Sequence, residues 1–388
     1  MNVDVVVVGA RCAGASAALL LARAGARVVV VDRGRYGSDT ISTHALMRGA
    51  VLQLHRWGVL PAIVEQGTPA VTATTFGYSQ EDVTVPIEPK YGVDALYAPR
   101  RTLLDGLLSA MAVESGAEVI YGVNVDGLIT DGDGRVRGIT ASAGGRRHTI
   151  EAGLVIGADG LYSTVARRVG AETLVAGRHA AATLYSYWSG VDEANYRWVF
   201  RPRGSIGAIP TNGGTCVFVA VPAAEFKTRL NGNPTDAYHR LLREICPEFA
   251  ARLDGATRVQ PVHGFGGHPG FIKRSTGPGW ALVGDAGYFK DPATAHGITD
   301  ALRDAELLAR AACVGTAAAM EQFETTRLDL SRRLFEVTDE IASFEYSDLQ
   351  LQSLHREFSR EMSREVRVLA GLGPQPSWGP PADARHVA

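Results

Sequence analysis

The chain opens with Val3-Asp4-Val5-Val6-Val7-Val8-Gly9-Ala10-Arg11-Cys12-Ala13-Gly14 and continues through an apolar stretch to Val28-Val29-Val30-Val31-Asp32-Arg33. A short run of β-branched residues is typical of a parallel strand buried on both faces. Residues 15–24 are small, apolar and compatible with a helix, which Gly25 ends. A strand, a glycine-rich turn, a helix and a second strand that closes on an acid form the dinucleotide-binding βαβ unit.

Each part of this unit has a physical role in binding a dinucleotide. Gly9 permits the tight turn, and Gly14 lets the helix lie close to the sheet. The N-terminus of the helix offers free N–H groups and a positive dipole end to a pyrophosphate. Asp32 stands where a carboxylate can accept hydrogen bonds from a ribose diol.

One position departs from the G-x-G-x-x-G pattern, because Arg11 replaces the middle glycine. A side chain therefore stands where the backbone normally approaches phosphate most closely. Two interpretations stay open on this motif alone. The turn holds no ligand, or the Arg11 guanidinium lies near the pyrophosphate.

The composition indicates a globular enzyme with a large interior. A chain of 388 residues exceeds a usual single core, so two domains are expected. A net charge of −2 gives no long-range attraction to nucleic acid or to an anionic membrane. The valine run is too short to span a bilayer and lacks the flanks of a signal peptide. We therefore expect a cytoplasmic protein without a membrane span, whose scattered cysteines are reduced core thiols: Cys12, Cys216, Cys246 and Cys313.

Turn signals and alternation organise the middle of the chain. Asp-Gly and Gly-Gly turns at 131–134 and 144–145 predict a three-stranded antiparallel meander over 123–151. Residues 71–87 alternate like a short hairpin, and most of 171–274 predicts a second, antiparallel sheet. Its aromatic residues are either core or the lining of a pocket: Tyr185, Tyr187, Trp188, Tyr196, Trp198 and Phe218.

Helical patterns surround these sheets. Residues 45–57 predict a helix for which Thr43 is the expected N-cap. Residues 297–310 predict an amphipathic helix, and the charged pattern over 320–369 predicts an outer helical layer. The proline-rich tail, 374–388, is expected to be irregular.

Three separated motifs together resemble the FAD-dependent monooxygenase family of the para-hydroxybenzoate hydroxylase fold. The first is the βαβ unit. The second, Gly157-Ala158-Asp159-Gly160 with Ser163 and Arg167, resembles the family's DG motif. The third, Gly284-Asp285-Ala286 with Asp291-Pro292 and Gly297, resembles its GD motif and flavin-facing helix. Arg101, Leu104 and Leu108 match its R-x-x-L-x-x-x-L helix.

The resemblance implies an α/β fold in which a Rossmann-like FAD-binding domain with an inserted meander is interleaved with an antiparallel substrate domain and followed by C-terminal helices. The expected boundaries are 1–70, 98–170 and 276–319 for the FAD-binding domain, 71–97 and 171–275 for the substrate domain, 320–373 for the helices and 374–388 for the tail.

The resemblance also implies the residues that bind FAD. Asp285 would hold the ribityl chain, and the helix that starts at Gly297 would face the flavin pyrimidine, where its dipole stabilises the reduced, anionic flavin. Asp159 would lie near flavin and nicotinamide nucleotide, or it would cap the end of its strand. The full expected set is Gly9, Ala10, Arg11, Cys12, Ala13, Gly14, Asp32, Arg33, Arg101, Asp159, Gly160, Gly284, Asp285, Pro292, Gly297 and Ile298.

By the same resemblance, the first expected function is an FAD-dependent monooxygenase. It would use NADPH or NADH and O₂, through a flavin C4a-hydroperoxide, to hydroxylate a hydrophobic, aromatic or polyketide-like molecule. A separate flavin reductase is an alternative source of electrons, since the chain shows one nucleotide fingerprint. The oligomeric state is left open.

Two related functions rank below hydroxylation. Tyr196-Arg197-Trp198-Val199-Phe200 resembles the Y-x-W-x-F-P segment of geranylgeranyl reductases, which implies a reductase or dehydrogenase acting on a C=C bond. Flavin-dependent halogenases share the fold, but their W-x-W-x-I-P segment is not reproduced and Lys90 is no clear counterpart of their lysine. A ligand-binding protein without catalysis is the remaining class.

Acid–base chemistry beside the flavin is assigned to three candidates: His44, His296 and Arg48. An imidazole titrates near neutrality and suits proton relay. The alternatives are a helix-capping role for His44 and a loop position for His296, while Arg48 would contact flavin or an acidic substrate. Lys290 and Tyr288 are further candidates. We expect His263 and His268 to be structural, and no metal is expected.

Overall fold

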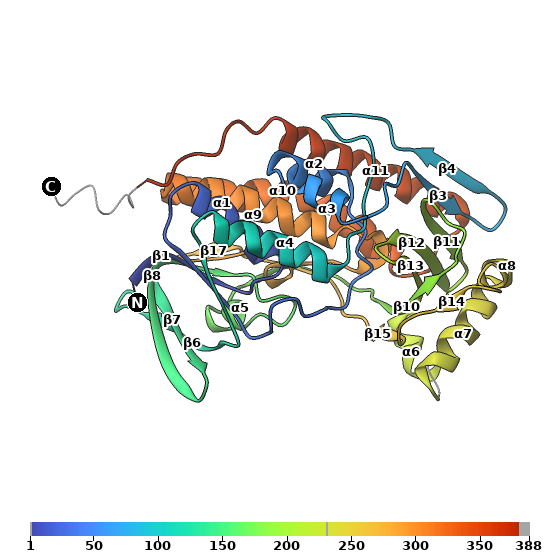
Figure 1. Ribbon diagram of the computed structural model, residues 1–388, viewed down its shortest axis with the longest axis horizontal. Helices are drawn as coiled ribbons and strands as arrows, with labels where there is room; N and C mark the ends of the chain where they lie inside the picture. Colours follow the sequence, from blue (N-terminus) through green and yellow to red (C-terminus); the bar gives the residue numbers. More distant parts are fainter. Residues whose placement is uncertain (1, 230–231, 380–388) are drawn as a thin grey trace.

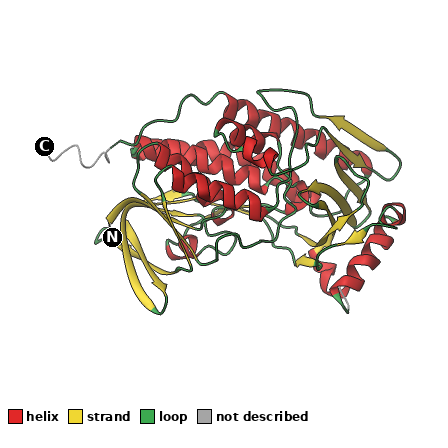
Figure 2. Ribbon diagram, in the orientation of Figure 1, coloured by secondary structure: helices red, strands yellow, loops and turns green. Residues whose placement is uncertain are grey.

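The computed structural model describes residues 2–229 and 232–379. Two sheets lie at opposite ends of an elongated molecule, and a layer of long helices covers the first sheet (Figure 1). Colouring by secondary structure separates this helical layer from the strands beneath it (Figure 2). The α/β fold class and the C-terminal helices are confirmed.

The first sheet has the strand order β17-β18-β8-β1-β2-β5, with β6 and β7 attached through β8. The pairs β1–β2, β1–β8, β2–β5 and β8–β18 are parallel, as the buried valine runs predict. Its strands are β1 Asn2–Val8, β2 Val28–Asp32, β5 Glu118–Tyr121, β6 Asn124–Thr130, β7 Val136–Ala143, β8 Arg146–Gly157, β17 Thr276–Gly277 and β18 Trp280–Leu282.

The predicted meander is present, and β8 joins it to the parallel sheet. The first half of β8 pairs antiparallel with β7, and its second half pairs parallel with β1. The long strand therefore carries the chain from the inserted meander back to the sheet edge where the β1–α1 turn lies.

Helices α1, α4 and α9 pack together over the sheet, and α10 and α11 pack outside α9 (Figure 1). This layer comprises α1 Cys12–Arg23, α2 Arg48–Arg56, α3 Leu60–Glu65, α4 Arg101–Glu114, α9 Gly297–Val314, α10 Ala317–Ile341 and α11 Asp348–Ala370. Helix α5, Thr164–Arg168, packs near β6 and β8 instead.

The second sheet has the order β14-β10-β13-β12-β11-β3-β4, with β15 beside β10. Its strands are β3 Ala73–Gly77, β4 Asp82–Pro86, β10 Ala181–Ser189, β11 Tyr196–Arg201, β12 Gly204–Thr211, β13 Gly214–Pro222, β14 Thr257–Arg258 and β15 His263–Phe265. The helices that follow β13 are α6 Ala223–Arg229, α7 Pro234–Ile245 and α8 Pro247–Ala251. The hairpin from residues 71–97 joins this sheet through the parallel pair β3–β11.

A small third sheet connects the two larger ones, in the order β19-β16-β9. It consists of β9 Thr173–Ala176, β16 Phe271–Lys273 and β19 Tyr288–Phe289. Short 3₁₀ turns, η1 Gly284–Ala286 and η2 Pro292–Thr294, flank β19. The GD motif therefore lies on the path between the two sheets.

The predicted helix over 45–57 is shorter than expected, and its predicted N-cap is wrong. Helix α2 starts at Arg48 with Met47 as N-cap. His44 has a φ of +69°, a left-handed conformation that interrupts the helix, and its N–H donates to the Ser42 hydroxyl. Thr43 therefore lies in an irregular loop before the helix.

The remaining expectations concern the cysteines and the ends of the chain. All four cysteines lie in the described part of the chain, where each is buried and unpaired. Among the described residues, no helix combines the length and the apolar character needed to cross a bilayer. Residues 374–379 of the tail form neither helix nor strand, and 380–388 lie outside the described residues.

Candidate functional site

The turn between β1 and α1 requires both of its glycines. Gly9 has a φ of +107°, and a Cβ there would lie 2.4 Å from the Ala158 carbonyl oxygen. A Cβ on Gly14 would lie 1.8 Å from the Gly9 carbonyl oxygen. These approaches bring the start of α1 against both the turn and the DG motif.

The GD motif also lies against the start of α1. A Cβ on Gly284, whose φ is +57°, would lie 3.0 Å from Ala13 Cβ and 3.3 Å from Ala301 Cβ. Gly284 is therefore held between α1 and α9. Three motifs that are far apart in the sequence thus converge at the N-terminal end of α1.

Two helices begin at this point without a side-chain cap. Arg11 is the N-cap of α1 and His296 is the N-cap of α9, and neither side chain accepts a hydrogen bond from its first turn. By contrast, Thr316 and Ser347 cap α10 and α11. Gly297 is exposed, with no other atom within 4 Å of its ideal Cβ position. At α1 the first N–H, Cys12 N, donates to Asp105, whereas the N-terminus of α9 has open space in front of Gly297, which suits an anionic group.

Two acidic residues, Asp32 and Asp285, belong to the motifs around the glycine turn. Asp32 accepts hydrogen bonds from Ala10 N at 2.7 Å and from Gly34 N at 2.6 Å. Burial raises the pKa of Asp285 to about 6, and Arg101 opposes that shift. Arg33, next to Asp32, is exposed and available to a nucleotide.

Arg101 is held by a carboxylate that sequence reasoning missed. Its Nη2 lies 2.9 Å from Asp105 Oδ2, and the pair is buried. Asp105 also accepts a hydrogen bond from Cys12 N at 3.0 Å, so it links α4 to the first turn of α1. The spacing of four residues between Arg101 and Asp105 was the available signal.

Asp159 caps the end of its strand, one of the two roles that the sequence allowed for it. It accepts hydrogen bonds from the Ser163 hydroxyl and from Thr164 N at 2.6 Å, and it thereby orders the turn into α5. Gly160 follows with a φ of +77°. The DG motif therefore supports the wall against which Gly9 packs.

The fold and this convergence define a class of protein, the FAD-binding oxidoreductases with two interleaved domains. The family described as "FAD binding domain" matches residues 2–336, and the chain belongs to that family. The residues present fit the cofactor. The close glycine approaches at the start of α1 suit a pyrophosphate, the uncapped N-terminus of α9 suits a flavin pyrimidine, and Asp32 suits a ribose.

The chain is also similar to individual proteins of this kind. The chain is 28% identical over 326 residues to the menaquinone reductase of Mycolicibacterium smegmatis. The alignment covers 79% of this chain and 75% of the relative. It is 29% identical over 330 residues to the digeranylgeranylglycerophospholipid reductase of Methanosarcina mazei, with coverage of 80% and 74%. The flavin-dependent brominase Bmp2 shares the fold, with a TM-score of 0.80, 19% identity and coverage of 98% and 95%. The resemblance to flavoproteins of this fold, reductases and halogenases included, is confirmed.

The sequence-predicted catalytic residues do not lie together. Arg48 donates to the backbone carbonyls of Val93 at 2.9 Å and Glu88 at 2.6 Å, so it fastens a loop. His296 points into a buried cluster of charged groups between α9 and α11, and Lys290 lies in the same cluster. Only His44, of the three, lies against the second sheet.

His44 is paired with Tyr187 of β10. The His44 Nε2 and the Tyr187 hydroxyl form a hydrogen bond, and the two rings are stacked. Burial and the guanidinium groups of Arg101 and Arg100 hold the pKa of His44 well below its usual range, so the imidazole is neutral at pH 7. Its Nδ1 is buried without a hydrogen-bond partner.

Arg100 lies directly over this pair. Its Cζ is 3.6 Å from the centre of the Tyr187 ring, a cation–π contact. The guanidinium also pairs with Asp39 at 3.2 Å. The loop that carries His44 reaches α9 through a hydrogen bond of 3.4 Å from Met47 N to the Thr299 hydroxyl. This hydrogen bond ties the loop to the first turn of α9.

The aromatic residues of the second sheet divide between its two faces. Side chains alternate along a strand, so Tyr185 and Tyr187 share one face and Trp188 takes the other. Trp188 packs outward against α7, and its Nε1 donates to the Tyr238 hydroxyl at 3.0 Å, so Trp188 is a core residue, the first of the two alternatives. The inner face packs with the core of the first domain and contains Tyr185, Tyr187, Tyr196, Trp198, Phe200 and Phe218.

The remaining candidates have simpler surroundings. Pro292 is exposed in η2, and Ile298 is half-buried in the first turn of α9. Tyr288 is buried beside the charged cluster, with Arg303 5.5 Å from its ring centre. His263 stacks on Tyr185, while His268 is half-buried and contacts the Pro269 carbonyl at 2.6 Å.

Arg11 reaches across the glycine turn, and its Nη2 lies 3.2 Å from the Asp39 carbonyl oxygen. We expect Arg11→Gly to weaken FAD binding by about tenfold or more, because a charge-assisted hydrogen bond and a positive charge near the pyrophosphate are lost. Titration of the apo chain with FAD measures the effect. Arg35→Gly, in the exposed loop that follows β2, removes equal charge and serves as control. Unchanged or tighter binding of FAD by Arg11→Gly would show that the arginine has no part in the site.

Proposed function

We propose that this FAD-dependent enzyme reduces a carbon–carbon double bond in a large hydrophobic substrate. The observation that carries the proposal is a proton-bearing pair, Tyr187 and His44, buried on an otherwise aromatic and apolar sheet face. Reduction of a C=C bond adds a hydride to one carbon and a proton to the other. FAD, when bound and reduced, supplies the hydride, and the chain must supply the proton.

The inner face of the second sheet is suited to bind the substrate and exclude water. Its aromatic side chains come from β10, β13 and β11, with β12 between the last two strands. The Tyr196 ring is fully buried in the core that the sheet shares with the first domain, and its hydroxyl donates to the Tyr97 carbonyl at 2.6 Å, so Tyr196 supports the face from within. An aromatic face of this kind suits an isoprenoid-like chain, and the guanidinium of Arg100 over Tyr187 is a charged group beside it.

The pair provides the proton in a site without bulk water. We assign the imidazole proton to Nε2, so that His44 donates to the Tyr187 oxygen and the Tyr187 hydroxyl proton is free to pass to carbon. The Nε2–H of His44 stays on the imidazole and stabilises the tyrosinate through a hydrogen bond, and Tyr187 regains its proton from water when the product leaves. Burial raises the pKa of Tyr187, and the guanidinium of Arg100 over the ring opposes that shift.

Two relatives that align with about four-fifths of the chain are named as reductases, which supports reduction over hydroxylation, the function ranked first from the sequence. Hydroxylation is the second candidate. The neutral, buried His44 favours it, because with Tyr187 it can accept a proton from a phenolic substrate. The brominase shares only the fold at this level of identity, and halogenation stays third.

Mass analysis of the product under ¹⁸O₂ distinguishes the candidates. The purified holoenzyme is supplied with NADPH or NADH, or with a separate flavin reductase, and with menaquinone and digeranylgeranylglyceryl lipid as probe substrates. We expect a product that gains two hydrogens and no ¹⁸O. A product that contains one ¹⁸O atom would replace reduction by hydroxylation.

A further inference from the structure

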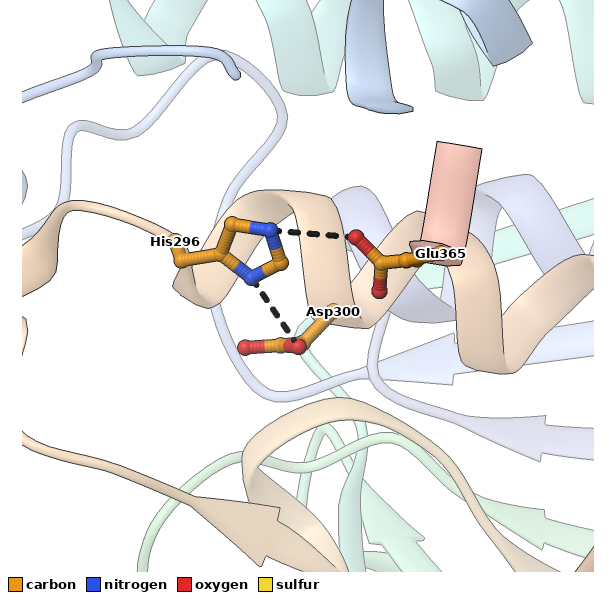
Figure 3. A group of neighbouring side chains, drawn as sticks. All are labelled: His296, Asp300 and Glu365. Atoms are coloured by element: carbon orange, nitrogen blue, oxygen red, sulfur yellow. Dashed lines mark hydrogen bonds and ion pairs between the residues drawn. The ribbon is translucent and has the colours of Figure 1, made fainter. Parts of the chain in front are cut away.

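A buried cluster of charged side chains lies at the start of α9, between α9 and α11. His296 Nδ1 lies 3.2 Å from Asp300 Oδ1, and His296 Nε2 lies 3.1 Å from Glu365 Oε2 (Figure 3). His296 is the N-cap of α9, Asp300 lies in its first turn, and Glu365 belongs to α11. All three side chains are at most 2% exposed, so the cluster excludes water.

Cations fill the remaining positions around these carboxylates. Lys290 Nζ contacts Asp300 and lies 2.9 Å from His296 Nδ1. Arg303 Nη1 bridges Asp300 at 2.9 Å and Glu365 at 2.8 Å. A divalent metal ion would have to displace these cations, so the His296, Asp300 and Glu365 group forms an ion-pair cluster and not a metal site.

The same cluster reaches the GD motif. Asp304 pairs with Arg303 at 2.7 Å and with Arg327 at 2.8 Å, and it accepts a hydrogen bond from Gly284 N at 3.2 Å. The positive charges of Lys290, Arg303 and Arg327 balance the carboxylates of Asp300, Asp304 and Glu365. The cluster thus holds two backbone segments that the family directs at FAD, the turn at Gly284 and the first turn of α9.

Glu365 is the member that α11 contributes, and it lies beyond residues 2–336, the part of the chain that the family matches. α11 also places the Phe358 ring edge-on to the His296 ring, with 5.7 Å between their centres. A buried ion pair gives little net stability against apolar residues, but it fixes geometry, and loss of one partner leaves an uncompensated charge.

We propose that Glu365 is a positioning residue that, through His296 and Arg303, fixes the N-terminus of α9 toward the bound flavin. His296 directly precedes Gly297, so a shift of the imidazole moves the N–H groups of the first turn. Those N–H groups stabilise the reduced, anionic flavin more than the oxidised one. Glu365 thereby sets the reduction potential of FAD through the position of α9. The proposal rests on FAD binding and not on which reaction the enzyme catalyses.

The test measures the reduction potential of bound FAD and its dissociation constant in Glu365→Gln and Glu365→Ala. We expect a more negative potential in both, larger for alanine, because reduced FAD loses affinity relative to oxidised FAD by about two- to thirty-fold. Glu361→Gln is the matched control, since Glu361 lies one turn earlier on α11 and pairs only loosely with Arg364, at 3.7 Å. Its potential should equal that of the wild type.

Two further measurements separate positioning from general damage to the fold. If Glu365→Ala fails to fold, the isosteric Glu365→Gln decides alone. Melting of the apo chain reports stability, and the double variant Glu365→Gln with His296→Gln should shift the potential no further than His296→Gln does. An unchanged potential in folded Glu365→Gln, or additive shifts in the double variant, would overturn the proposal.

Discussion

Replacing Gly14 with alanine is expected to abolish FAD binding at micromolar concentrations. The new Cβ would lie 1.8 Å from the Gly9 carbonyl oxygen and 3.1 Å from Ala158 Cβ. The Gly9 oxygen belongs to the backbone, so α1 must move away from the turn. Overpacking of this kind costs about 1–3 kcal/mol or more. Because displacement of α1 also moves the N–H groups that face the pyrophosphate, we expect affinity to fall by about 100-fold or more.

Titration of the apo chain with FAD measures this loss, and circular dichroism of the same sample shows whether the chain is folded. Gly132→Ala is the matched control, because Gly132 lies in the exposed β6–β7 turn with nothing within 4 Å of its ideal Cβ position. It should bind FAD as the wild type does. Normal FAD affinity in Gly14→Ala would mean that the glycine turn does not hold the cofactor.

Tyr187→Phe is expected to lower the rate of the chemical step by about 10²- to 10⁴-fold, the usual contribution of a positioned acid or base. The substitution keeps the aromatic ring under Arg100 and removes only the hydroxyl that bonds to His44. FAD affinity should change little, because Tyr187 lies on the second sheet and not among the glycine motifs. Stopped-flow measurement of substrate-dependent oxidation of the reduced flavin gives the rate directly.

Tyr238→Phe is the control for that substitution. The Tyr238 hydroxyl is also buried and hydrogen-bonded, to Trp188 Nε1 and the Val217 carbonyl, both at 3.0 Å, but it lies behind the sheet. Its loss should cost about 1 kcal/mol of stability and leave the rate of the chemical step unchanged. Equal rates in Tyr187→Phe and the wild type would remove the pair from the mechanism.

The sequence predicted the features that depend on local pattern. Buried valine runs, glycine turns and the Asp-Gly and Gly-Gly hairpins gave the parallel sheet, the β1–α1 turn and the meander in their observed places. These features rest on strand alternation and on left-handed glycines such as Gly9. The order of the three motifs then indicated the family that the comparison confirmed.

Features that depend on distant contacts were not predicted. Tyr187 and His44 are 143 positions apart, and no local pattern joins them. Glu365 reaches His296 from a helix whose charged pattern resembles an ordinary solvated face. Thr43 was predicted as an N-cap because it precedes an apolar stretch, but the left-handed His44 breaks the helix before it begins. The buried side of a charged helix becomes visible only when its packing partner is known.

Anaerobic mixing of reduced holoenzyme with substrate tests directly whether the enzyme reduces a C=C bond of a hydrophobic substrate. The flavin is reduced by light or dithionite, the excess reductant is removed, and menaquinone or digeranylgeranylglyceryl lipid is added without oxygen. We expect the flavin to be reoxidised at a rate that depends on substrate concentration, with one C=C bond reduced for each flavin oxidised. A flavin that stays reduced with both probes until O₂ is admitted, and then yields oxygenated product, would contradict it.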